Sequence, residues 1–118
     1  MFLDQTGFEE FIKFVPKTLV SLSLFQCKDI KDLSPLEKLN NIEYLNFYWN
    51  RKATKLWNMT FTPKLQTLQM VDCNKIIDFS YLKNANIKKL RLMGCNGLSS
   101  FTSKLMIDDL SNIFNMKI

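Results

Sequence analysis

An internal repeat constrains this chain more than any other feature. One spacing of apolar residues, closed by Cys or Asn, recurs four times: Leu19-Leu22-Leu24-Cys27, Ile42-Leu45-Phe47-Asn50, Leu65-Leu68-Met70-Cys73 and Ile87-Leu90-Leu92-Cys95. The copies start at residues 19, 42, 65 and 87, so successive starts are 23, 23 and 22 residues apart. A period of this length is typical of a solenoid, in which stacked units bury one continuous core and display another face.

The first repeat shows what one unit is expected to look like. Leucines flank a polar residue at Leu22-Ser23-Leu24, which predicts a short strand with one buried face. After Cys27 an apolar residue falls at every third position, as far as Leu39. That period is typical of a 3₁₀ or polyproline-like turn. Stacked units would therefore form a parallel sheet, with return segments too short for a full α-helix.

Three repeats share a signal for the start of a helical turn. Ser34-Pro35-Leu36-Glu37 combines a capping serine, a proline and a glutamate three residues after the serine, and predicts a turn that starts at Pro35. Ser80 and Thr102 occupy the same offset in the third and fourth repeats. The second repeat differs, because Trp57 stands at this offset and Ala53 replaces the column Ile30, Ile76 and Leu98. We therefore predict a differently shaped return segment over residues 54–62.

With these residues, the chain resembles leucine-rich repeat proteins, especially the short-period class of bacterial internalins and phosphatase-regulatory subunits. The closest match is residues 28–39, KDIKDLSPLEKL, and the resemblance covers residues 19 to about 102. It implies an α/β fold: a solenoid of about four repeats (19–41, 42–64, 65–86 and 87–102) with a parallel sheet on the concave face and short helical turns on the convex face. Cys replaces the usual Asn except at Asn50, as in the cysteine-type repeats of ubiquitin-ligase adaptors. The Cys-rich flanking caps of secreted members are missing, which favours an intracellular setting.

Both ends of the chain are expected to cover the stack. Thr6-Gly7-Phe8-Glu9 reads as a capping box, and it predicts a short amphipathic helix over residues 7–14 within an N-terminal cap of residues 1–18. Residues 103–118 would form the C-terminal cap. A helical stripe and a final edge strand both fit that segment, and the choice stays open: Met106, Leu110, Ile113 and Phe114 for the helix; Phe114, Met116 and Ile118 for the strand.

Residue types exclude several kinds of chemistry. The chain has no histidine, so His-based catalysis and His-containing metal sites are excluded. Cys27, Cys73 and Cys95 share one repeat position, which predicts a buried column rather than a disulfide or zinc site. Phosphate loops, nucleophile elbows and paired carboxylates are also missing. We therefore expect a non-catalytic protein without cofactors.

The sequence also lacks the patterns typical of signal peptides and membrane spans. The first residues lack a basic segment followed by an apolar one, and no apolar run approaches the length of a membrane span. We therefore expect a cytoplasmic protein that does not enter membranes and is monomeric by itself. The net charge of +5 comes mostly from the C-terminal half.

The residues between the strand leucines are the candidate functional ones, because they would face the concave surface. Exposed aromatic residues beside polar ones are typical of protein-binding hot spots. We predict a partner-binding site made of Phe25, Tyr44, Asn46, Tyr48, Trp49, Gln69, Arg91 and Met93. In the alternative interpretation, the position after each strand tucks under the neighbouring loop and completes the core, and Phe25 and Met93 fit either role.

A basic cluster in the fourth repeat suggests another function. Lys88, Lys89 and Arg91 could bind an acidic partner or nucleic acid, although a charged strand face is usually only solvated. The aromatic residues and the cluster belong to different repeats, separated by the strand around Gln69, which argues against one continuous nucleic-acid groove. A protein partner is therefore the primary prediction.

Overall fold

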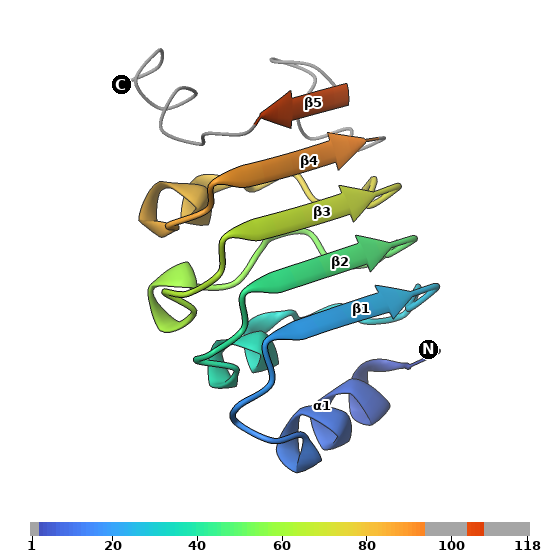
Figure 1. The fold of residues 1–118 in the computed structure, drawn as a ribbon. Coiled ribbons are helices and arrows are strands. Elements are labelled where there is room, and N and C mark those ends of the chain that lie inside the picture. The colour runs from blue at the N-terminus through green and yellow to red at the C-terminus, as the bar shows by residue number, and fades with distance from the viewer. Residues whose placement is uncertain (1–2, 94–103, 108–118) are drawn as a thin grey trace.

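The fold is α/β and is built around a sheet whose first four strands run parallel (Figure 1). The computed structural model describes residues 3–93 and 104–107. Within these residues, the α-helix α1 (Gln5–Phe14) precedes the strands β1 (Ser21–Phe25), β2 (Tyr44–Tyr48), β3 (Thr67–Val71), β4 (Lys89–Met93) and β5 (Lys104–Ile107). Three short 3₁₀ helices connect the parallel strands: η1 (Ser34–Lys38), η2 (Met59–Phe61) and η3 (Ser80–Asn84). The predicted short strands and compact return segments are both present.

The parallel strands pair at equivalent positions of the sequence repeat. Leu22 is opposite Leu45, Leu45 is opposite Leu68, and Leu68 is opposite Leu90. Because the repeat length and the register agree, each buried side chain meets its counterpart in the next strand. A shift by one residue would turn every leucine away from the core, so the apolar pattern strongly specifies this register.

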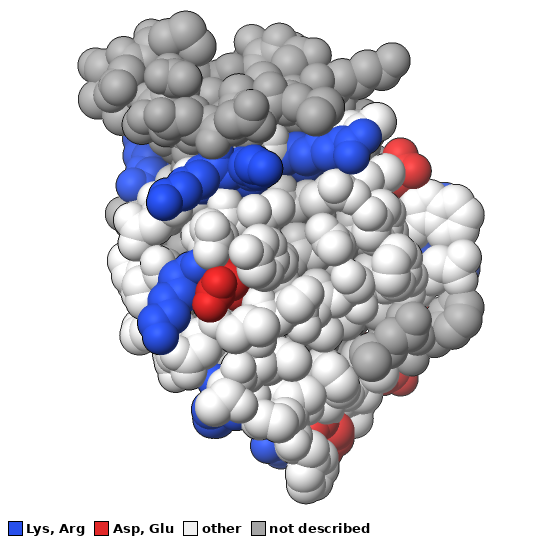
Figure 2. All heavy atoms as spheres, viewed as in Figure 1, with Lys and Arg blue, Asp and Glu red and all other residues white. Residues whose placement is uncertain are grey.

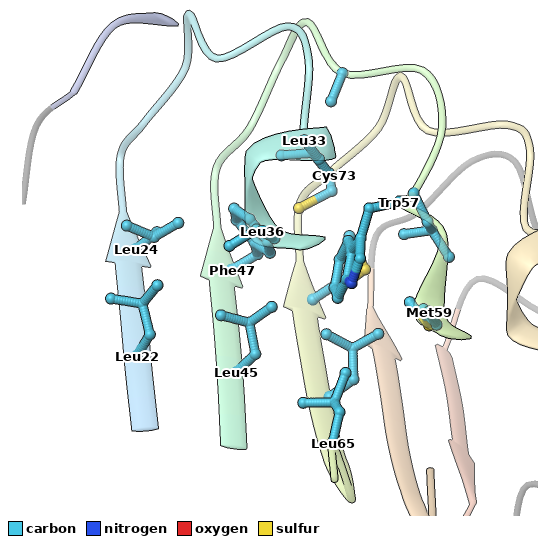
Figure 3. Close-up of a cluster of buried hydrophobic side chains, with 14 of the residues drawn as sticks. Leu22, Leu24, Leu33, Leu36, Leu45, Phe47, Trp57, Met59, Leu65 and Cys73 are labelled. Atoms are coloured by element: carbon cyan, nitrogen blue, oxygen red, sulfur yellow. The ribbon is translucent and has the colours of Figure 1, made fainter. Parts of the chain in front are cut away.

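The core lies between one face of the sheet and the 3₁₀ helices (Figure 3). Leu22 and Leu24 of β1, like Leu45 and Phe47 of β2, point from the sheet toward this layer. Each 3₁₀ helix adds a buried side chain at an apolar position: Leu36, Met59 and Leu82. Cys27 and Cys73 are buried, as the column predicts, and Cys95 lies outside the described residues.

The chain leaves each of the first three strands through a residue in the left-handed region. Gln26, Trp49 and Asp72 have φ of 56°, 60° and 57°. Each of them still donates its backbone N–H to the last carbonyl of the next strand, as Trp49 does to Val71 at 2.9 Å. The left-handed turn then brings the following residue, Cys27, Asn50 or Cys73, back into the core. A left-handed non-glycine residue is uncommon and costs about 1–2 kcal/mol, so the sheet register imposes this conformation.

Asn50 closes its turn differently from the cysteines. After Cys27, the Ile30 N–H donates to the Cys27 carbonyl at 3.5 Å. In the second repeat, the equivalent Ala53 N–H donates to the Asn50 side-chain Oδ1 at 2.9 Å. The Asn50 Nδ2 then donates to the carbonyls of Cys27 and Ile30 in the preceding repeat, at 3.1 and 2.9 Å. Asn50 therefore joins two repeats through a buried amide.

The second return segment has the different shape that its sequence predicts. Its 3₁₀ helix η2 spans three residues, against five in η1 and η3. The indole of Trp57 is buried and donates to the Thr62 hydroxyl at 3.1 Å. Ala53 is fully buried. Ala53 is smaller than the isoleucines of the neighbouring repeats, and Trp57 is among the largest fully buried side chains.

The first helix starts earlier than predicted, and its cap is a different residue. α1 begins at Gln5 rather than residue 7, because Asp4 is the N-cap and its carboxylate accepts from the Gly7 N–H at 2.8 Å. Thr6, the predicted cap, lies inside the helix. The helix is amphipathic as predicted, with Phe8 and Ile12 buried in the core.

Aspartates, rather than the predicted serines, hold the start of two 3₁₀ helices. The Ser34 N–H donates to Asp32 at 2.9 Å, and the Ser80 N–H donates to Asp78 at the same distance. Both helices therefore begin at the serine, and in the first repeat this is one residue before the predicted Pro35. The capping-box prediction failed because an aspartate two residues earlier supplies the acceptor.

The last described strand was not predicted. β5 pairs antiparallel with β4, with Leu90 opposite Ile107 and Arg91 opposite Met106. The helical alternative for the C-terminal segment is therefore wrong at Met106, which lies in a strand. Leu110, Ile113, Phe114, Met116 and Ile118, on which the rest of both alternatives depended, lie outside the described residues.

Candidate functional site

One face of the parallel sheet is left open toward the viewer in Figure 1. We call it the open face. It consists of alternate strand residues, all exposed or half-buried: Ser21, Ser23 and Phe25; Tyr44, Asn46 and Tyr48; Thr67, Gln69 and Val71; Lys89, Arg91 and Met93. It contains all of the predicted site residues except Trp49, which follows β2 directly.

The aromatic residues at the ends of β1 and β2 form a defined group. The Phe25 and Tyr48 rings stack with their centroids 4.7 Å apart and their planes 10° from parallel. The Trp49 side chain is beside them, and its indole N–H donates to Asp72 at 3.1 Å. These side chains line a shallow hollow of about 260 Å³, the aromatic hollow, whose lining is Phe25, Gln26, Tyr48, Trp49, Val71 and Asp72.

Exposure separates the two interpretations of these residues. Phe25 keeps 45% of its surface exposed and Trp49 keeps 41%, so neither side chain completes the core. Met93 is half-buried and does not line the hollow. Tyr44 is 43% exposed, but it lies at the other end of β2 from Tyr48, about 13 Å along the strand. The predicted aromatic patch is therefore two separate features, a hollow and an isolated tyrosine.

Hydrogen bonds link the polar middle row of the open face across the strands. The Asn46 side chain donates to the Ser23 hydroxyl at 3.1 Å. The Gln69 amide donates through Nε2 to the Tyr48 hydroxyl, and its Oε1 accepts from Arg91 Nη1 at 3.5 Å. Gln69 therefore connects the aromatic hollow with the basic end of the face.

The basic cluster is smaller on this face than the sequence suggests. Lys89 and Arg91 are exposed on the open side of β4, whereas Lys88 precedes the strand. Figure 2, viewed as Figure 1, shows lysine and arginine gathered over β4 and a mostly uncharged surface over β1–β3. The strand order places β3 between β4 and the two strands that carry Phe25 and Tyr48, as expected.

Three residues of the hollow, Gln26, Val71 and Asp72, were missed as site residues. Gln26 and Asp72 line it because they occupy the left-handed position that Trp49 also occupies. The available signal was positional: the fourth repeat has Gly94 at this point of the sequence, and glycine favours positive φ.

The described residues offer little reactive chemistry. Burial raises the pKa of the Cys27 thiol, which disfavours the nucleophilic thiolate. Across residues 3–93 and 104–107, no group of three His, Cys, Asp or Glu side chains could hold a metal ion. Among these same residues, none of the helices has the length and apolar character needed to cross a bilayer. What the open face provides is apolar surface, amide hydrogen bonds and two cations.

Comparison with known proteins leaves the family open. No protein-family model, curated protein sequence or solved structure matches this chain.

Proposed function

We propose that this chain is a small leucine-rich repeat solenoid that binds a protein partner through the open face of its sheet and catalyses no reaction. The in-register pairing of the sequence repeats supports the repeat assignment. The open face would then be the concave face of the solenoid. We also propose a cytoplasmic location.

The aromatic hollow is the observation that carries the proposed function. Phe25 and Trp49 are exposed, although both could bury a large apolar area. Each is also held in place, Phe25 by its stack on Tyr48 and Trp49 by its bond to Asp72. Rigid exposed aromatic residues lose little entropy when a partner covers them, and such residues typically contribute about 2 kcal/mol or more to binding.

The rest of the face fits a binding surface better than a catalytic one. Its middle row consists of hydroxyl, amide and guanidinium groups that are hydrogen-bonded in pairs, Ser23 with Asn46 and Gln69 with Arg91. General acid–base catalysis needs a titratable group placed against a reacting atom, usually in a cleft that excludes water. The hollow is shallow and its one carboxylate, Asp72, accepts from Trp49.

Affinity capture with matched variants tests this proposal. The chain is immobilised, incubated with extract of its native cells, and the retained proteins are identified by mass spectrometry. Phe25→Ala with Trp49→Ala removes two exposed aromatic side chains from the hollow. The control, Phe14→Ala with Ile77→Ala, removes two exposed apolar side chains that do not line it.

We expect the hollow variant to bind a captured and purified partner at least about tenfold more weakly, and the control to bind as the wild type does. Both variants should melt within a few degrees of the wild type, because none of the four side chains is in the core. A partner that binds the hollow variant normally and the control poorly would overturn the proposal.

A further inference from the structure

We infer that the partner presents an extended acidic segment, which crosses the strands with one apolar side chain in the aromatic hollow and a carboxylate on Lys89 and Arg91. This inference rests on the proposed function and names the chemistry of the partner. The two groups that would bind the segment are the aromatic hollow and the pair Lys89 and Arg91, and Gln69 lies between them on the open face.

The charge of the open face has one sign. None of the open-face residues of β1–β3 is charged, and β4 contributes Lys89 and Arg91. Asp72 lies at the rim of the hollow and accepts from the Trp49 indole. A cationic edge on the same face as an aromatic hollow attracts a ligand that is acidic at one end and apolar at the other.

Gln69 lies between the two ends of this face and contacts both. Its amide group bonds to the Tyr48 hydroxyl on one side and accepts from Arg91 on the other. Only one guanidinium nitrogen of Arg91 takes part in that bond, so the guanidinium keeps donors for a carboxylate. Arg91 can therefore contact Gln69 and still donate to a carboxylate of the ligand.

The spacing of the strands sets the distance between the ligand's apolar anchor and its acidic residue. Tyr48 and Arg91 are two strands apart across the sheet and two residues apart along it, since Tyr48 aligns with Val71 and Val71 with Met93. With about 4.8 Å between strands and about 3.3 Å per residue, the two sites lie about 12 Å apart. An extended peptide covers that distance in three or four residues. The ligand therefore carries its acidic residue three or four positions from its apolar anchor.

An extended peptide fits this face better than a nucleic acid does. A single strand needs exposed ring faces for its bases and cations along its backbone. Here the Phe25 and Tyr48 rings face each other, and among the parallel strands β1–β4 the open-face cations lie on β4 alone.

Selection from a displayed library of random peptides of about twelve residues tests the inference. The bait is the full chain, and the competitor is Lys89→Glu with Arg91→Glu. The control, Lys38→Glu with Lys83→Glu, makes the same charge change in η1 and η3. Circular dichroism checks that each variant folds, and Lys89→Gln with Arg91→Gln replaces the reversal if it does not.

We expect the wild type to enrich peptides with an aromatic or aliphatic residue and Asp or Glu three or four positions apart. A synthetic peptide of that sequence should bind about tenfold more weakly to the reversed variant and normally to the control. Its binding should also weaken as NaCl rises from about 50 mM to about 500 mM.

Three results would overturn the inference, and they differ in what they say about the proposed function. Enriched peptides that need Trp49 but carry no acidic residue would leave the proposed function standing. Peptides that depend on neither Trp49 nor the two cations would remove both. A labelled oligothymidine that binds more tightly than any peptide, and loses binding in the reversed variant, would make nucleic acid the ligand.

Discussion

Asn50 gives the sharpest test of how neighbouring repeats are held together. Its buried side chain accepts from the N–H groups of Lys52 and Ala53 and donates to the carbonyls of Cys27 and Ile30, at 3.2, 2.9, 3.1 and 2.9 Å. The substitution Asn50→Ala removes all of these bonds and leaves buried backbone groups unpaired. Cysteine occupies this position in the other repeats, so the repeat fold itself does not require an amide side chain here.

The size of the effect follows from those bonds. A buried hydrogen bond contributes about 1 kcal/mol, and an unpaired buried group costs more than a bond exchanged with water. Lys52 is exposed, so water can reach its N–H. The remaining groups together predict a loss of about 3 kcal/mol in the free energy of unfolding. For a domain of this size the melting temperature should fall by about 10 °C.

Urea denaturation followed by tryptophan fluorescence and circular dichroism measures the loss. The control is Asn86→Ala, because Asn86 is exposed and its side chain donates to the Pro63 carbonyl of the preceding repeat. It should lose less than about 1 kcal/mol. If Asn50→Ala lost no more than Asn86→Ala, the bridging role of the Asn50 amide would be refuted.

Three further predictions concern the turns and the core. Gln26→Gly should keep or slightly raise stability, and Gln26→Val should lose about 2 kcal/mol, because φ is 56° there; equal stability in urea denaturation would contradict this. Trp57→Ala should lose about 3–5 kcal/mol and leave Thr62 without its indole donor, and a loss below 1 kcal/mol would show that the indole is not in the core. Cys27, whose thiol pKa is raised by burial, should resist iodoacetamide in the native protein at about pH 8, with peptide mapping by mass spectrometry as the readout; fast labelling would exclude its burial. Because the folded state favours the neutral Cys27 thiol, the contribution of this thiol to folding stability should decline as the pH rises above about 9.

Most of the fold could be predicted from the repeat pattern. Equivalent leucines must share one core, so positions such as Leu22, Leu45 and Leu68 predict both the strands and their register. The shape of the second return segment was also predictable, since Ala53 and Trp57 break the pattern together.

Local chemistry that depends on tertiary contacts was less predictable. Left-handed turns at Gln26 and Trp49 contradict the preferences of those residue types, and the ladder to the next strand imposes them. Asp32 replaced Ser34 as the acceptor at a helix start, because both residue types can cap and only geometry decides. Antiparallel pairing of β5 had no counterpart in the repeat.

The sequence predicted which face of the sheet carries the candidate site residues, but not which of these residues lie together. Alternation places Phe25, Tyr48 and Arg91 on the side opposite the buried leucines, where the structure has them. Tyr44 is separate from the hollow because it lies at the other end of β2. The sequence prediction grouped the aromatic residues without considering this distance along the strand. The roles of Gln26 and Asp72 follow from the turn, which periodicity does not reveal.

The two tryptophans offer the most direct test of the open face as the binding surface. Trp49 lies at the aromatic hollow and is 41% exposed, whereas Trp57 is buried behind the sheet at 1%. In a ¹H–¹⁵N spectrum of the full chain, their indole N–H groups give two separate signals. Titration with the captured partner should shift or broaden the Trp49 indole signal and leave the Trp57 signal in place. A Trp49 signal that stays unchanged at saturation would contradict the central claim.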